Sequence, residues 1–155
     1  MREQEFAQRL EGLKPRLYRI ALLYFGGSES RAVDVVDEAV YRAYCSLRKL
    51  RQPEHFETWM TRILINECHR EQKRMSRFQP IDTLPEEAEE QYDSLPLKEA
   101  LGKLPRNLKE VVLLRYFAGY TQVETAKALE LPQTTVLSYQ RRALALLRLE
   151  LGEEE

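Results

Sequence analysis

The sequence predicts an all-α protein made of two small helical domains that an acidic linker joins. Three observations lead to this prediction. Apolar residues recur at spacings of three and four along most of the chain, which is the period of amphipathic helices. Alternating strand patterns and hairpin dipeptides such as Asn-Gly are absent. The 155 residues, 43% of them hydrophobic, suffice for one ordinary domain or two small ones.

Charge divides the chain into blocks although the formal net charge is only −1. Residues 1–75 and 98–152 each carry a small excess of basic side chains, whereas residues 76–97 hold six acidic side chains, one arginine and three prolines. Such shifts in composition mark linkers, and proline disfavours helix in the residue before it. We therefore expect domains at 1–76 and 97–152 with a linker at 77–96. A long surface loop within one domain is the alternative.

The first block predicts three helices. Pro15 should kink the first or begin a second segment, Gly26-Gly27 should end it, and Ser28 or Ser30 can cap the next. A break at 50–53 precedes the third helix, where Phe56 and Trp59 are expected in the core. The residues that recur at the helical period are, in order, Phe6, Leu10, Leu13, Leu17, Ile20 and Tyr24; Val33, Val36, Val40, Tyr44 and Leu47; and Phe56, Trp59 and Ile63, with the polar Asn66 next in the third series.

The second block predicts a short helix at 97–104, a second that starts near Pro105, and then a helix-turn-helix at 121–142. Thr121 and Glu124 fit a capping box. Ala126 fits the crossing of the two helices, and Leu131-Pro132 forms the turn. The second helix would place its first residues in the major groove of DNA. An antiparallel helix pair without a DNA role looks similar.

Several function classes find no support. No apolar run reaches the ~20 residues of a membrane span, and no secretory signal is visible. Cys45 and Cys68, expected buried or half-buried, form no metal or redox motif, and His55 and His69 lack partners at metal-ligand spacing. We expect a cytoplasmic protein with no enzymatic activity, cofactor, metal ion or small-molecule substrate.

Two sets of residues carry a resemblance to a known family. The second block resembles the C-terminal domain of a bacterial RNA polymerase sigma factor through Leu104-Pro105, Tyr116-Phe117-Ala118-Gly119, Glu124, Ala126, Leu129, Pro132, Thr135-Val136 and Ser138. The first resembles the N-terminal core domain of such factors through Leu17-Tyr18-Arg19, Asp34, Glu38, Arg42-Ala43-Tyr44, Phe56-Glu57-Thr58-Trp59-Met60, Ile63 and Asn66. Two such domains in this order, with a short linker, match the small extracytoplasmic-function class.

The resemblance implies an alternative sigma factor with region 2-like and region 4-like domains. Its second helix would dock on core RNA polymerase through Asp34, Asp37, Glu38 and Tyr41. Many relatives carry Gln where this chain has Asp37. The acidic side chains lie at helix-adjacent spacings and could meet arginines through charge-assisted hydrogen bonds.

The same domain would capture unstacked bases of the proximal promoter element. Polar groups read base edges, while Lys and Arg contact phosphates. The candidates for this single-strand site are Arg51, Gln52, His55, Arg62, Asn66, Arg70, Lys73 and Arg74.

The last helix would read the distal promoter element as duplex DNA. Arg142 matches a base-reading arginine of the family, and the full candidate set is Gln133, Thr134, Thr135, Ser138, Arg141 and Arg142. The chain departs from its relatives at Thr125, Glu130, Leu137, Tyr139 and Gln140, which predicts weaker duplex binding and a shallower salt dependence. Tyr139 could stack on a sugar or touch a thymine methyl group.

The implied partners are core RNA polymerase, promoter DNA and an anti-sigma factor, and the free protein is expected to be a monomer. Two alternatives stay open. A stand-alone helix-turn-helix regulator would use only the second domain and would dimerise. A helical adaptor would bind polymerase without reading promoter DNA.

Overall fold

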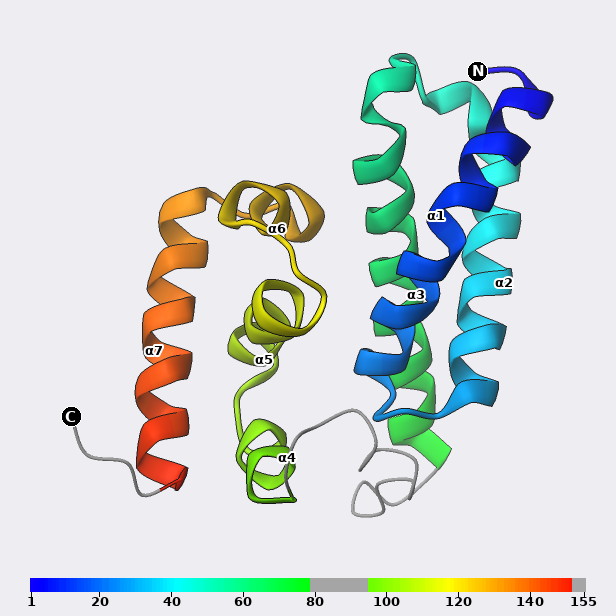
Figure 1. The fold of residues 1–155 in the computed structure, drawn as a ribbon. Helices are drawn as coiled ribbons and strands as arrows, with labels where there is room; N and C mark the ends of the chain where they lie inside the picture. The colour runs from blue at the N-terminus through cyan, green and yellow to red at the C-terminus, as the bar shows by residue number, and fades with distance from the viewer. Residues whose placement is uncertain (79–94, 152–155) are drawn as a thin grey trace. The chain divides into compact units, whose positions relative to one another are not determined.

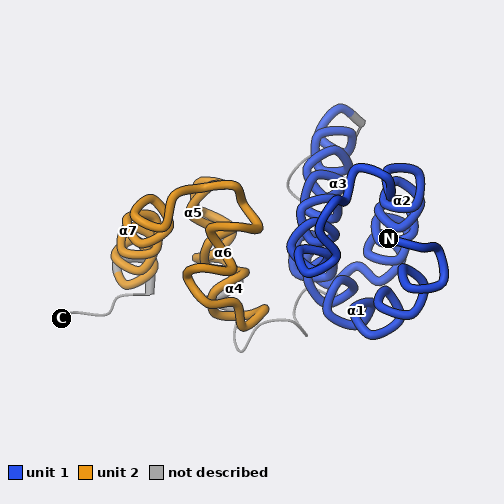
Figure 2. Tube along the Cα trace, turned by 90° about the horizontal axis from the view of Figure 1, so that it is seen from above, with its two compact units in different colours: residues 1–84 blue, residues 85–155 orange. Residues whose placement is uncertain are grey.

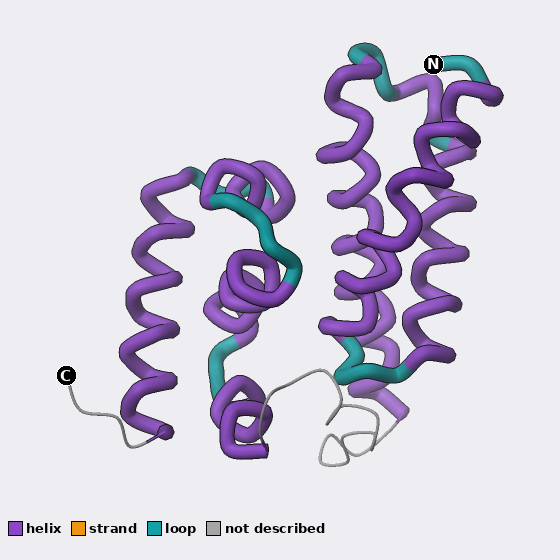
Figure 3. Tube along the Cα trace, viewed as in Figure 1, coloured by secondary structure: helices purple, strands orange, loops and turns teal. Residues whose placement is uncertain are grey.

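The computed structural model describes residues 1–78 and 95–151, which form two compact units divided between residues 84 and 85 (Figure 2). Every regular element in the described part is a helix, which confirms the predicted all-α class (Figure 3). None of the described helices has the length and apolar character needed to cross a membrane. Most of the linker predicted at 77–96 lies outside the described residues.

The N-terminal unit packs three long helices side by side (Figure 1). They are α1 at Glu3–Tyr24, α2 at Glu29–Cys45 and α3 at Phe56–Phe78, with short 3₁₀ turns η1 at Leu47–Lys49 and η2 at Pro53–His55. Helix α1 runs through Pro15 as one element, so no second segment begins there. It ends where Gly26 adopts a left-handed conformation with φ 61° and Gly27 N donates to Leu22 O at 2.8 Å.

The buried face of α2 differs from the predicted one. Its core residues are Ala32, Val35, Val36, Ala39 and Ala43, so among the predicted residues of α2 itself only Val36 was placed correctly. The predicted Val33 and Tyr44 are exposed and Val40 is half-buried. Alanines face inward because α2 packs against both α1 and α3, and small side chains let helices approach closely.

The core stripe of α3 is also displaced from the predicted one. Phe56, Met60, Leu64 and Cys68 are buried, whereas Trp59 and Ile63 are only half-buried and Asn66 is exposed. The prediction was right for Phe56 and wrong for Trp59. The rings of these two residues still lie close, with centroids 6.2 Å apart. Asn66 therefore stands on an accessible side of the helix.

The C-terminal unit contains α4 at Leu95–Gly102, α5 at Arg106–Val112, the π-helix η4 at Leu113–Phe117, α6 at Gln122–Leu129 and α7 at Gln133–Leu151 (Figure 1). Two apolar clusters hold it together. One joins α4 and α5 to the middle of α7, and the other joins Val111, Ala126 and Val136. Ala126 thus lies where α5, α6 and α7 meet, as the helix-turn-helix pattern predicts.

Local hydrogen bonds fix both ends of α6. Glu124 N donates to Thr121 Oγ1 at 3.1 Å and Thr121 N donates to Glu124 Oε1 at 3.0 Å, which confirms the capping box. The helix ends at Glu130, whose φ of 58° is the one positive value among the described non-glycine residues. Thr125, one of the departures from the relatives, is fully buried and donates its hydroxyl to Thr121 O at 2.8 Å.

Candidate functional site

The acidic residues predicted for polymerase docking lie on one exposed face of α2. Asp34, Asp37, Glu38 and Tyr41 occupy positions i, i+3, i+4 and i+7, and all four are exposed. Asp34 and Asp37 form no ion pair within the described residues, whereas Glu38 pairs with Arg42 at 3.3 Å. The structure therefore brings the predicted docking residues together and leaves two carboxylates available to a basic partner.

Tyr41 adds a neutral polar group to this face. Its side chain is 64% exposed. A hydrogen bond with the Cys45 thiol, reinforced by the charges of Cys45 and Glu38, raises the pKa of Tyr41 above its ordinary value of 10.0. The phenol therefore keeps its proton at neutral pH. Both cysteines were predicted to be buried or half-buried. The prediction is confirmed for Cys68, which is buried, and wrong for Cys45, which is exposed.

The predicted single-strand residues fall into two groups. Arg51, Gln52 and His55 are exposed in the segment before α3, and the second group follows along the helix itself as half-buried Arg62 and exposed Asn66, Arg70, Lys73 and Arg74. From the start of α3 to its last basic candidates the helix rises about 1.5 Å per residue, roughly 25 Å in all. The first group therefore lies next to the start of α3, and the second is spread along the length of that helix.

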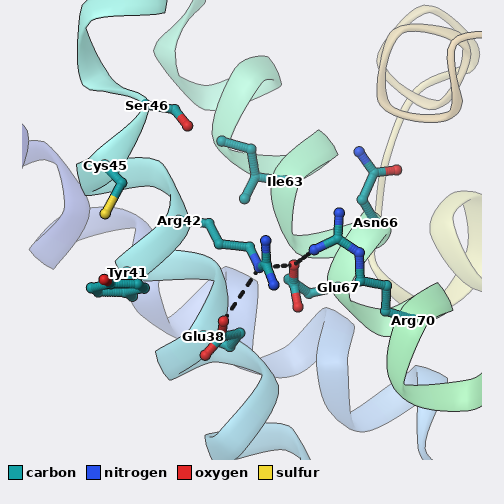
Figure 4. A pocket seen from close by; sticks show the side chains of 9 residues that line it. All are labelled: Glu38, Tyr41, Arg42, Cys45, Ser46, Ile63, Asn66, Glu67 and Arg70. Carbon is teal, nitrogen blue, oxygen red and sulfur yellow. Dashed lines mark hydrogen bonds and ion pairs between the residues drawn. The ribbon is translucent and has the colours of Figure 1, made fainter. Parts of the chain in front are cut away.

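A pocket of about 360 Å³ lies between α2 and α3, with side chains from both helices around it (Figure 4). Its lining includes Glu38 and Tyr41 from the docking face and Asn66 and Arg70 from the single-strand candidates. The pocket thus lies where the two predicted surfaces of the N-terminal unit adjoin.

Glu67 is a residue in this pocket that the sequence analysis missed. Its carboxylate accepts a hydrogen bond from Arg70 Nη1 at 2.7 Å and pairs with Arg42 Nε from the neighbouring helix (Figure 4). The Glu67 side chain is only 8% exposed. A signal was present, since a helical wheel that buries Leu64 and Cys68 also turns Glu67 inward, and a buried acid requires partners.

A second ion pair neutralises the end of the basic series. Arg74 donates from Nε to Glu71 Oε2 at 3.0 Å and from Nη2 to Glu71 Oε1. The hydrogen bond with Arg74 holds the pKa of the Glu71 carboxyl below its ordinary value of 4.5. Two of the predicted phosphate-binding cations are therefore engaged by acids of their own helix.

The predicted duplex-reading residues lie along the first half of α7. Gln133, Thr134, Ser138, Arg141 and Arg142 are exposed, and Thr135 is half-buried. Arg141 and Arg142 form no ion pair within the described residues. Both guanidinium groups are therefore available to DNA.

Two of the atypical residues of α7 face inward. Tyr139 is half-buried and packs against both apolar clusters, so part of its ring serves the core, and a contact with a sugar or a thymine methyl group stays a prediction. Gln140 accepts a hydrogen bond from Arg115 Nε at 3.1 Å, and Arg115 Nη1 donates to Tyr120 O at 2.7 Å. The sequence analysis missed Arg115, which links η4 to the recognition helix and to the residue before Thr121.

Comparisons with known proteins cover both units. The family model for sigma-70 region 2 matches residues 10–78, and the model for sigma-70, region 4 matches residues 100–149. The RNA polymerase sigma factor SigV of Bacillus subtilis (strain 168) is 31% identical over 147 residues, which cover 92% of this chain and 88% of that protein. The RNA polymerase sigma-E factor of Streptomyces coelicolor is 32% identical over 127 residues, with 77% and 71% covered.

A solved structure shares the fold. The structure of CnrH in complex with the cytosolic domain of CnrY matches with a TM-score of 0.72 and 27% sequence identity. The match covers 97% of this chain and 90% of CnrH. The similarity therefore extends over nearly the whole length of both proteins.

Proposed function

This chain belongs to the sigma-70 family of RNA polymerase sigma factors, in the extracytoplasmic-function class. On that premise we propose which of its surfaces bind core polymerase and which bind promoter DNA. It is an alternative sigma factor, which binds core RNA polymerase and directs promoter recognition and transcription initiation. The observation that carries this conclusion is the presence of both sigma-70 regions, in order, over most of the chain.

The acidic face of α2 is the proposed docking surface for core polymerase. Asp34 and Asp37 are exposed and have no internal ion pair within the described residues, so basic side chains of a partner can approach them. Charge-assisted hydrogen bonds to carboxylates are roughly twice as strong as neutral ones. Glu38 and Tyr41 extend the same face.

DNA contacts divide between the two units in this proposal. The segment with Arg51, Gln52 and His55, together with Arg62, Asn66 and Lys73 on α3, captures the proximal element as a single strand. Arg70 and Arg74 belong to the same surface but are already paired with acids of their own helix. The exposed residues of α7, above all Arg142, read the distal element as duplex. An arginine that bonds guanine O6 and N7 contributes about 1–3 kcal/mol of discrimination.

Regulation and cellular context follow from the family. We propose that an anti-sigma factor covers the polymerase-binding surfaces of this chain, which agrees with the fact that CnrH was solved in complex with a domain of another protein, CnrY. Sigma factors are not enzymes, and we propose that this one has no catalytic activity, cofactor, metal ion or small-molecule substrate of its own. We further propose that it acts in the cytoplasm and is a monomer when free.

Transcription by purified core RNA polymerase on sheared genomic DNA tests the proposal. With the protein added, new transcript starts should share two spaced upstream elements. The Asp34→Arg/Asp37→Arg variant should abolish these starts because it reverses the charge of the docking face. A Glu5→Arg/Glu11→Arg variant makes the same charge change on α1 and should retain them.

The other outcomes separate the alternatives. Binding of core polymerase without new starts would favour the helical adaptor. No binding of core polymerase, combined with dimerisation, would favour a stand-alone helix-turn-helix regulator.

A further inference from the structure

Glu67 is the carboxylate on which the α2–α3 pocket is built. It pairs with Arg42 of α2 and accepts a 2.7 Å hydrogen bond from Arg70 of α3. Its own side chain is 8% exposed, while those of Arg42 and Arg70 are 45% and 59% exposed. A single buried acid thus holds two guanidinium groups that otherwise have access to solvent (Figure 4).

The burial of the Glu67 carboxylate favours its ion pairs with Arg42 and Arg70. A carboxylate removed from water is costly unless opposite charges and hydrogen bonds compensate it. Arg42 also pairs with Glu38 at 3.3 Å, so two acids compete for its charge. Both arginines are therefore engaged within the protein when DNA arrives.

The ion pairs of Glu67 lie next to a residue that is proposed to read a base. Asn66, the proposed base reader, is exposed and lines the same pocket. Contacts with phosphates give affinity without sequence information, whereas contacts with base edges give specificity. An acid that engages the cations beside a base-reading residue therefore lowers the affinity that comes from phosphate contacts. It leaves the specificity that comes from base contacts in place.

We infer that Glu67 is a positioning residue for strand capture: it holds Arg42 and Arg70 at the α2–α3 pocket beside Asn66 and withholds their charges from the DNA backbone. Capture of the proximal element then depends on base contacts more than on phosphate contacts. This inference rests on the proposed function and adds to it a residue that sets the selectivity of the single-strand site.

The test measures binding of single-stranded DNA to the full chain assembled with core polymerase. The probes are a labelled oligonucleotide that carries the proximal element read from the mapped transcript starts, a scrambled version of it, and a pool of random-sequence oligonucleotides. Fluorescence anisotropy over a range of salt concentrations gives the affinity and the salt slope. The ratio of affinities for the first two probes gives the selectivity.

Glu67→Gln keeps the shape of the side chain and removes its charge. Each additional cation that binds a phosphate of single-stranded DNA adds about 0.7 to the salt slope, so two released arginines add up to about 1.4. When the salt concentration is raised from roughly 50 to 200 mM, the affinity of Glu67→Gln for single-stranded DNA should fall about sevenfold more than that of the wild type. Its selectivity should fall severalfold, while Glu67→Asp, which keeps the charge, should stay closer to the wild type.

Glu71→Gln is the matched control, because it removes an acid one turn later, whose ion pair is with Arg74. It should raise the slope by about 0.7 at most and leave the selectivity unchanged. The fluorescence of Trp59, the only tryptophan, reports whether the N-terminal unit is folded. If Glu67→Gln disturbs it, Glu67→Met repeats the test with an apolar side chain that suits the buried position.

Two results would overturn the inference. Equal changes in Glu67→Gln and Glu71→Gln would mean that any acid on α3 acts by general charge alone. An unchanged slope and selectivity in folded Glu67→Gln would mean that Glu67 has no role in strand capture. Failure of the proposed function is distinct, since the wild type would then give no transcript starts, whereas the salt slopes of the variants can still be compared on the free full chain with the random pool.

Discussion

The two units of the molecule hold their polar side chains in different ways. The N-terminal unit uses ion pairs, among them Arg16–Glu57 between helices, Arg70–Glu67 and Arg74–Glu71. The C-terminal unit has an Arg106–Glu110 pair but fixes its helix-turn-helix with the Thr121 capping box and the Arg115–Gln140 hydrogen bond. Arg70 and Arg74 are therefore paired beside the proposed single-strand site, whereas Arg141 and Arg142 on α7 form no ion pair within the described residues.

A count of basic residues therefore overstates the positive charge that α3 can offer to DNA. The α3 helix carries the longer basic series, but acids of the same helix engage Arg70 and Arg74. The α7 helix has few basic residues, and two of them have no ion pair within the described residues. We expect salt to affect the duplex contacts of the second unit more strongly.

The largest expected effect on DNA binding comes from replacing an available arginine on α7, compared with a paired arginine on α3. Arg142→Ala should reduce discrimination of the distal element about tenfold, because a bidentate arginine–guanine contact contributes about 1–3 kcal/mol. Arg74→Ala should cost only about twofold in single-strand affinity, because Glu71 already engages its charge. Anisotropy with selected and scrambled DNA measures both. A larger loss for Arg74→Ala would contradict the contrast between paired and available arginines.

Helix N-caps provide the next comparison. Thr121 accepts from Glu124 N, whereas Ser28, at the N-cap of α2, makes no side-chain cap hydrogen bond. Thr121→Ala should therefore lower the unfolding free energy by about 1 kcal/mol, and Ser28→Ala by much less. Hydrogen exchange of amides in α6 reports the first change, and denaturant titration followed by Trp59 fluorescence reports the second. Equal losses would show that the cap hydrogen bond is not the source of the difference.

Residues in the left-handed backbone conformation follow two of the helices, and they give a similar comparison with a smaller expected effect on stability. Gly26 follows α1 with φ 61°, while Glu130 ends α6 with φ 58°. Glu130→Gly should stabilise the C-terminal unit by up to about 1 kcal/mol, because glycine adopts this conformation without a Cβ clash. Glu130→Ala removes the same charge without that relief and is the control. Hydrogen exchange in α6 and α7 separates the two, and equal stability of the variants would refute the backbone argument.

The smallest expected effect is a pH dependence in the C-terminal unit. Burial lowers the pKa of Lys109 on α5 below its ordinary value of 10.5. Between the lowered pKa and 10.5, the unfolded chain binds more protons than the folded one, so the unfolding free energy should rise with pH. At lower pH both states hold the proton, and burial of the charge stays a constant cost.

Lys109→Met removes the titrating group and should flatten this rise. Lys127→Met, at an exposed position of α6, should leave it in place. Hydrogen exchange or thermal unfolding at several alkaline pH values measures the slope. A rise that persists in Lys109→Met would assign it to another group.

The helical class, the order of the two sigma-like blocks and the ends of several helices could be predicted from the amino-acid sequence. These features are local: the period of apolar residues sets the helices, and Thr121, Glu124 and the glycines act on their own neighbours. The exposed docking acids and most of the exposed residues of α7 could also be predicted, because polar side chains at one helical spacing share one face.

The buried face of each helix and the pairing of charges depend on how the helices pack in three dimensions. Alanines define the core face of α2, and Trp59 and Tyr139 are half-buried at the edges of cores, because packing depends on how closely neighbouring helices approach. The pairings of Glu67 with Arg42 and of Gln140 with Arg115 join residues 25 positions apart in the chain. Their energies depend on burial and on distances between helices, which a one-dimensional pattern does not contain.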